Sequence, residues 1–428
     1  MKTNLLIILF ALINLSLFAQ VTERDATTGH STVTVSNEES SIGVTIYYFG
    51  GEKSTGTYSN ELWKCEAPGV YIEVETNEGP SARRDHLSWV YGNTMFVKGG
   101  RIEGGTCLDD LWGLDLSSNT WTQHSSSLGN SAYSQAAVVI GSIVYIYGGS
   151  NSDGESLDGF YSINMDSKSF ILDVLTSGVE ALQGMAIAAY NGAVCVIGGL
   201  LHDWDNVAPG YQPSFSANTW RYNPSKNDEK GTWEYVTTTG DPFTELTFMA
   251  YTQDPDNNYL YTFGGRTYDY ENELELFDNE IFKLDLTTMT WSELPVTLPV
   301  SISNATASFA GDKILIFGGQ DENENVSESM YIFYPATNTI EEITYIENQN
   351  ARTNVSIFPN PAESFIQIST FNQTEIKYVD IIDCTGKTVL ETEVLPNSTI
   401  DISGLNSGIY FIKFEGNNSD TNYKLIKL

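Results

Sequence analysis

The side chains that could perform chemistry in this sequence are few and widely separated. The four histidines are His30, His86, His124 and His202. No two of them have the spacing of a metal-ligand pair, which argues against a copper centre. Three arginines, Arg84, Arg101 and Arg266, are candidates for holding a carboxylate group. No catalytic residue is predicted from these residues.

Two acidic loops are candidates for binding a cation. The stretches DPDNN at 254–258 and DENEN at 321–325 place oxygen-bearing side chains at every second position, as calcium loops do. Neither has the glycine or the distal bidentate glutamate of an EF-hand. A solvated acidic loop is therefore the favoured interpretation and no cofactor is predicted, with calcium kept as the alternative.

Six short apolar runs that end in paired glycines must position these residues. They are TIYYFGG, TMFVKGG, IVYIYGG, AVCVIGG, YLYTFGG and KILIFGG, with their second glycines at 51, 100, 149, 199, 265 and 319. Their β-branched and aromatic composition predicts strands, and the glycines supply positive φ or room for close backbone approach. The second glycines lie 49, 49, 50, 66 and 54 residues apart, which indicates a repeat of about 50 residues.

Each repeat continues in the same way after its glycines. A polar loop leads to a strand with an aromatic residue, then to a turn and a second large apolar residue, while the segment before the glycines supplies a fourth strand. Five tryptophans fall in this pattern and are expected to pack between neighbouring sheets: Trp63, Trp112, Trp121, Trp233 and Trp291.

The paired-glycine-then-aromatic pattern, in six consecutive copies over residues 26–346, resembles the kelch-repeat family, including the propeller domain of galactose oxidase-like proteins. The resemblance implies an all-β fold, a six-bladed kelch β-propeller with four strands per blade, and a seven-bladed ring is the alternative. Kelch repeats commonly carry a packing histidine at the positions of His30 and His86.

Antiparallel strands sort the loops onto two faces. One face, here named the glycine-pair face, carries the loops that follow the glycine pairs: residues 52–60, 101–110, 150–158, 200–218, 266–279 and 320–329. These loops contain 18 Asp and Glu residues against Lys53, Arg101 and Arg266. Binding sites concentrate on long loops held by a rigid scaffold, so this face is expected to bind a cation or a basic partner.

The fourth and fifth repeats carry insertions whose aromatic residues have no repeat position to fill. They are Trp204, Tyr211, Phe215, Tyr268 and Tyr270. Aromatic side chains beside charges at a loop rim are typical of binding hot spots. The predicted ligand-binding residues are therefore Trp204, Tyr211, Tyr268, Tyr270, Arg101 and Arg266.

Different segments flank the repeats. Residues 1–19 have a basic start, a short apolar stretch and a small residue before Gln20, which predicts a signal peptide. The propeller is expected over 20–347. From 352 to 428, the motifs FPNP, VDIIDCTGK, LNSGIYFIKF and KLIKL resemble the type A C-terminal sorting domain of the type IX secretion system of Bacteroidota. The resemblance implies a small Ig-like β-sandwich, export through the periplasm, cleavage of this domain, and release or surface attachment; an accessory Ig-like module is the alternative.

Charge and composition limit the partners. The net charge is −34, which argues against nucleic acid, and no segment after the leader is long and apolar enough to span a bilayer. Pairing of Cys65 with Cys107 stays open. The favoured function is a secreted or cell-surface binding module for a protein or a carbohydrate. The alternative is a sugar-acting enzyme on the same scaffold, similar to the sialate mutarotases or, less favoured, to galactose oxidase.

Overall fold

The computed structural model describes residues 24–343 and 355–427, apart from 168–169, 171, 176–178, 203–212, 226–230, 242, 244, 359–361, 363, 371–375, 384–386, 394–398 and 417–421. The chain divides into two compact units, Met1–Tyr345 and Ile346–Leu428. The regular secondary structure of the described residues is entirely β.

The first unit contains six antiparallel sheets of four consecutive repeat strands, here called blades 1 to 6. Blade 1 has β2 (Ser31–Ser36), β3 (Val44–Phe49), β5 (Leu62–Ala67) and β6 (Val70–Glu73). Blade 2 has β7 (Leu87–Tyr91), β8 (Thr94–Lys98), β9 (Leu111–Asp115) and β10 (Thr120–Ser125). Blade 3 has β11 (Ala136–Ile140), β12 (Ile143–Tyr147), β13 (Phe160–Asn164) and β14 (Leu172–Leu175).

The other three blades repeat this order. Blade 4 has β15 (Ala186–Tyr190), β16 (Ala193–Ile197), β19 (Thr219–Asn223) and β20 (Thr232–Tyr235). Blade 5 has β22 (Ala250–Gln253), β23 (Tyr259–Asp269), β24 (Leu274–Asp285) and β25 (Thr290–Glu293), and β21 (Thr239–Gly240) pairs with β25 in parallel. Blade 6 has β26 (Ser303–Ala310), β27 (Lys313–Gln320), β28 (Met330–Tyr334) and β29 (Thr339–Ile343).

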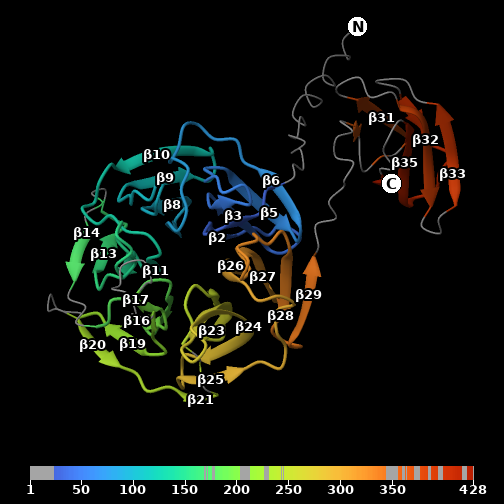
Figure 1. The fold of residues 1–428 in the computed structure, drawn as a ribbon. Coiled ribbons are helices and arrows are strands. Elements are labelled where there is room, and N and C mark those ends of the chain that lie inside the picture. Colours follow the sequence, from blue (N-terminus) through green and yellow to red (C-terminus); the bar gives the residue numbers. More distant parts are fainter. Residues whose placement is uncertain are drawn as a thin grey trace, which may run out of the picture. The chain divides into compact units, whose positions relative to one another are not determined.

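The blades form a ring in which the first strand of each blade lies toward the centre and the last lies at the periphery (Figure 1). The inner strand β2 of blade 1 contacts both β7 of blade 2 and β26 of blade 6, so the first and last blades meet. Radial packing of this kind leaves few exposed sheet edges. The prediction of an all-β kelch propeller is confirmed.

The glycine pairs join each blade to the next. In blades 1 to 5, the N–H of the second glycine donates to a carbonyl oxygen at the start of the following blade. The bond from Gly149 to Leu182 (2.8 Å) is an example. The first glycine has positive φ, and a Cβ on Gly148 would lie 2.2 Å from that same oxygen of Leu182. Only glycine combines this conformation with such close backbone approach, which explains the repeated phrase in the sequence.

Aromatic side chains fill the space between blades, as predicted. Trp121 of blade 2 packs on Phe49 of blade 1 with ring centroids 5.3 Å apart, and Trp291 is 2% exposed in a cluster that combines blades 4 and 5. Trp63 lies in the cluster that joins blade 1 to blade 6. Trp112 and Trp233 are only partly buried. Cys65 is buried and donates to the carbonyl oxygen of Ala67, and it forms no disulfide with Cys107.

One predicted loop is an extended hairpin. In blade 5, β23 and β24 continue past Gly265 and pair as far as Asp269 and Leu274, whereas β3, β8, β12 and β16 end before their glycines. Short strands also occur on this face, namely β1 (Thr27–Thr28) with β4 (Glu52–Lys53) and β17 (Leu200–His202) with β18 (Ser214–Phe215). The expectation of a loop over 266–279 is therefore wrong for most of its length, because its residues pair across the hairpin.

The second unit has the two sheets of a small sandwich. One contains β30 (Val355–Phe358), β31 (Phe365–Thr370) and β34 (Thr399–Asp401). The other contains β32 (Ile376–Asp383), β33 (Thr388–Glu393), β35 (Gly408–Gly416) and β36 (Asn422–Lys427). Buried residues of both sheets, including Ile366, Ile381 and Ile412, form one core, as expected for a sandwich.

Candidate functional site

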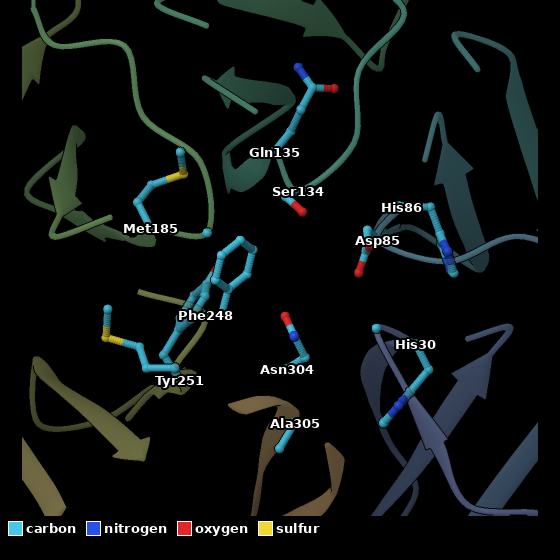
Figure 2. Close-up of a pocket in the computed structure, with 13 residues that line it drawn as sticks. His30, Asp85, His86, Ser134, Gln135, Met185, Phe248, Tyr251, Asn304 and Ala305 are labelled. Atoms are coloured by element: carbon cyan, nitrogen blue, oxygen red, sulfur yellow. The ribbon is translucent and has the colours of Figure 1, made fainter. Parts of the chain in front are cut away.

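A small pocket lies at the centre of the propeller and takes two residues from each blade, plus Tyr251. Its volume is about 130 Å³, and Figure 2 shows Asp85, Ser134, Phe248 and Asn304 arranged around it. Each blade contributes a turn residue and the residue that follows it, immediately before or at the start of its inner strand. The turn residues are Gly29, Asp85, Ser134, Gly184, Phe248 and Asn304, and those that follow are His30, His86, Gln135, Met185, Met249 and Ala305.

All six turn residues have positive φ, between 51° and 64°. Each N–H donates to the carbonyl oxygen of the turn residue in the preceding blade. In order around the ring, the donors Asp85, Ser134, Gly184, Phe248, Asn304 and Gly29 make bonds of 2.7, 2.9, 3.1, 2.8, 2.8 and 3.2 Å. This axial ring of six hydrogen bonds closes on itself. It satisfies the peptide groups at the pocket and leaves the side chains to determine what the pocket can bind.

Ion pairs flank one side of the axial pocket. Asp85 accepts hydrogen bonds from Nε of Arg84 (2.9 Å) and Nε of Arg101 (3.0 Å), and Arg84 also pairs with Glu52. Burial alone would raise the pKa of the Asp85 carboxyl, but the two guanidinium groups outweigh burial and lower this pKa. Asp85 is therefore an ionised carboxylate whose Oδ2 is paired with two guanidinium groups, and its lowered pKa makes it a weak base.

The two arginines predicted as binding residues both lie against residues that line or border the pocket. The Arg101 guanidinium stacks over Tyr133 at 4.6 Å and also pairs with Asp85. The Arg266 guanidinium stacks over Phe248 at 4.4 Å and pairs with Glu275 (2.9 Å). The rim of the pocket thus combines aromatic rings with paired charges of both signs.

The pocket histidines have structural partners in neighbouring blades. His86 Nε2 lies 2.7 Å from Ser31 Oγ of blade 1, and His30 Nε2 lies 2.8 Å from Thr306 Oγ1 of blade 6. Burial, and then the charge of Arg83, lower the pKa of His86 to about 3, while burial and Arg24 lower that of His30 well below its usual value. Both rings are neutral at physiological pH and pack as kelch histidines are expected to do.

The predicted aromatic residues fall into three groups. Tyr268 is 8% exposed and packs in a cluster with Leu200 and Phe215. Tyr270 is 43% exposed and lies edge-on to Tyr268, with ring centroids 5.3 Å apart. Trp204 and Tyr211 lie outside the described residues.

In the two loops considered for calcium, an aspartate carboxylate accepts hydrogen bonds from backbone N–H groups of its own loop. Asp254 accepts from the backbone N–H groups of Asp256 and Asn257, and Asp321 accepts from those of Asn323 and Asn325. Within the described part of the chain, no group of three or more His, Cys, Asp or Glu side chains is placed to hold a metal ion.

The burial of Lys98 was not anticipated. Lys98 is fully buried between blades 2 and 3, where its Nζ donates to the carbonyl oxygen of Asn130 (3.2 Å) and to Oε1 of the pocket residue Gln135 (3.1 Å). Burial lowers the pKa of Lys98 to about 8. The sequence did contain an indication of this site: Lys98 directly precedes the glycine pair in TMFVKGG, where the other five runs have an apolar or aromatic residue.

Comparison with known proteins decides the family. Residues 8–199 and 184–381 match the KLHDC2/KLHL20/DRC7 Kelch-repeats domain. The chain belongs to the kelch-repeat family. Kelch repeats suggest a protein-binding module. The axial pocket of this chain lies on the glycine-pair face, where each inner strand begins. No curated protein matched the chain.

The kelch propeller is followed by an export module. Residues 356–428 match the secretion system C-terminal sorting domain, in agreement with the resemblance to type IX sorting domains. The kelch protein is therefore a type IX substrate, secreted or displayed at the cell surface. No helix in the described ranges is long and apolar enough to cross a membrane.

Proposed function

We propose that this kelch protein is an exported binding module whose glycine-pair face recognises a protein partner at the blade 5 hairpin and the axial pocket. The observation that carries this proposal is the hairpin itself. Three of its large apolar side chains are exposed: Tyr270 by 43%, Leu274 by 55% and Leu276 by 40%. Leu274 and Leu276 alternate along β24 and so share one side of the hairpin. Exposed apolar groups clustered in this way are typical of protein-interaction surfaces.

The dimensions of the site favour a macromolecule. The axial pocket, at about 130 Å³, is smaller than the roughly 300–1,000 Å³ typical of small-molecule sites. A protein could cover the hairpin and insert a single side chain into the pocket. The acidic loops around the pocket favour a partner with a basic surface, and the affinity should therefore fall as salt rises.

The chemistry of the pocket favours binding over catalysis. His30 and His86 are neutral and hydrogen-bonded to neighbouring blades, and Asp85 is paired with two arginines. A sugar-acting enzyme would need a free acid or base there, so the enzyme alternative is the weaker hypothesis.

We also propose the route of export. Residues 1–19 act as a signal peptide that carries the chain to the periplasm, and the module at 352–428 then directs the propeller at 20–347 across the outer membrane and is removed. The match of residues 356–428 to a sorting domain supports this route.

Substitutions on the hairpin test the proposed function. The full chain is used to isolate partners from host surface proteins, and affinity is then measured for Leu274→Ser/Leu276→Ser. We expect at least a ten-fold loss of affinity with an unchanged melting temperature, since both side chains are exposed. Val174→Ser is the matched control, because Val174 is 78% exposed on the outer strand of blade 3. Equal affinity of the hairpin variant and the control would contradict the proposal.

A further inference from the structure

A second cavity opens between blades 1 and 2 and shares no lining residue with the axial pocket. Its volume is about 870 Å³, within the range typical of small-molecule sites. It is bounded by Asn60 of blade 1, by the connection between the blades at residues 76–81, and by Asp110, Trp112 and Trp121 of blade 2. We refer to it as the blade 1–2 groove.

Trp112 departs from the packing role of its counterpart in blade 1. Trp63 and Trp112 both occupy the second position of the third strand, and each indole N–H donates to a carboxylate two residues earlier. The acceptors are Glu61 (3.2 Å) and Asp110 (2.8 Å). Trp63 is 5% exposed, whereas Trp112 is only partly buried and lines the groove. Blade 2 therefore presents an aromatic ring that blade 1 buries.

The orientation of Trp112 is fixed by Asp110, which is itself held by a buried arginine. Arg83, which is fully buried, donates to both oxygens of Asp110 at 2.7 and 2.8 Å. This bidentate ion pair holds the carboxylate that in turn holds the Trp112 indole. A ligand that stacks on the ring would therefore not have to order it first, which favours binding.

The polar wall of the groove offers hydrogen-bonding groups without a positive charge. Glu78 and Asn60 are both exposed. Glu78 forms no hydrogen bond or ion pair with another described residue. A carboxylate accepts hydrogen bonds, while an amide both donates and accepts them. The Asn60 amide nitrogen donates a long hydrogen bond to the carbonyl oxygen of Pro80 (3.5 Å). The amide of Asn77 is occupied by the backbone of Trp121, with bonds of 2.6 and 3.1 Å. Lysine and arginine are absent from the groove lining.

We propose that the blade 1–2 groove binds a neutral carbohydrate. A sugar ring has an apolar C–H face that can stack on Trp112, and hydroxyl groups at its edge that can donate to Glu78 and bond to Asn60. Glu78 and the acidic loops disfavour sulfated or carboxylated sugars. The site is independent of the hairpin proposed to bind protein, so a failure at one site does not bear on the other.

The test begins with the full chain on an array of neutral and anionic oligosaccharides, followed by calorimetric titration with the best neutral ligand. Trp112→Ala is expected to weaken binding at least about ten-fold, while Trp112→Tyr retains most of the affinity because it keeps an aromatic face. Glu78→Ala, an exposed substitution that should not disturb folding, is expected to weaken binding by a similar factor. Tyr235→Ala is the control, since Tyr235 is 57% exposed on blade 4.

Three results would overturn the proposal. They are the absence of binding to any neutral oligosaccharide, a preference for anionic ones, and wild-type affinity in both Trp112→Ala and Glu78→Ala. If Trp112→Ala lowers the melting temperature, the affinity of Glu78→Ala decides the outcome.

Discussion

The backbone N–H of Asp85 donates to the carbonyl oxygen of Gly29 across 2.7 Å, and this is the shortest bond of the axial ring. The two residues occupy the same turn position in blades 1 and 2, and both have positive φ. The bond from Gly29 to Asn304 (3.2 Å) then joins the first blade to the last. The axial pocket is thus built on a closed circle of peptide groups, with two lining residues from each blade and Tyr251 as a third from blade 5.

Two glycines allow the backbone strain of a positive φ to be measured separately from the steric clash of an added Cβ. Gly148 and Gly141 have nearly the same φ, 64° and 62°, but a Cβ would meet Leu182 at 2.2 Å in the first case and nothing within 4 Å in the second. Gly141→Ala should therefore cost only about 1 kcal/mol of unfolding free energy. Gly148→Ala should cost about 1–3 kcal/mol more, because the added methyl group also displaces the next blade. Urea unfolding of both variants measures the difference, and equal losses would show that close approach is not the reason for the glycine.

The packing of Trp291 gives a second prediction. Its ring stacks on Phe243 with centroids 4.3 Å apart, and its buried indole N–H has no hydrogen-bond partner among the described residues. Trp291→Ala should lower the free energy of unfolding by about 3–5 kcal/mol. Trp291→Phe should cost much less, since it keeps a stacked ring and loses no hydrogen bond. Tyr235→Ala is the exposed control, with an expected change within about 0.5 kcal/mol. If Trp291→Ala and Tyr235→Ala lost similar amounts of unfolding free energy, Trp291 would not contribute to the core as described.

Features that every repeat shares could be predicted from the sequence. The glycine pairs, the two packing histidines and the buried tryptophans Trp63, Trp121 and Trp291 were placed correctly, because every blade needs similar contacts with its neighbours. Trp112 and Trp233 are only partly buried. The axial ring could not be predicted, since its residues are Gly, Asp, Ser, Gly, Phe and Asn. Their shared positive φ is imposed by the ring of hydrogen bonds, and local propensity does not account for it at Phe248.

The candidate site was predicted only in outline. Arg101 and Arg266 do lie beside the axial pocket, but the sequence could not show that Asp85 and Glu275 neutralise them. The register of the blade 5 hairpin also lay beyond the sequence pattern, because its charged residues resemble those of a solvated loop. Burial of Tyr268 follows from that hairpin, which packs it beside Leu200 and Phe215 of the neighbouring blade.

Protonation of His86 should make the stability of the propeller sensitive to acid. Below pH 6.5 the unfolded chain takes up a proton on this residue, whereas the folded chain does so only near the lowered pKa of about 3. The contribution of His86 is therefore fully present above pH 6.5 and is lost progressively as the pH falls toward 3. His86→Gln introduces the residue found at this position in blade 3. From pH 6.5 to pH 5, the free energy of unfolding of the wild type should fall by about 2 kcal/mol more than that of His86→Gln. Denaturant unfolding at both pH values measures this, and an unchanged pH dependence would contradict it.

Export should depend on the C-terminal module. A chain that lacks residues 352–428 is expected to fold as a propeller and to accumulate in the periplasm of a type IX host, because its sorting signal is missing. Cell fractionation with immunodetection measures this. Normal amounts of the truncated protein at the cell surface or in the medium would show that the proposed route is wrong.

The most direct test of the central claim asks which face of the propeller touches its partner. A photo-cross-linking amino acid is placed at Leu276 on the blade 5 hairpin, or at Asp312 in the exposed turn between β26 and β27 on the opposite face, in the full chain displayed on its host. A binding site on the glycine-pair face predicts a discrete cross-linked protein from position 276 and none from position 312. A cross-linked protein from position 312 alone would contradict it.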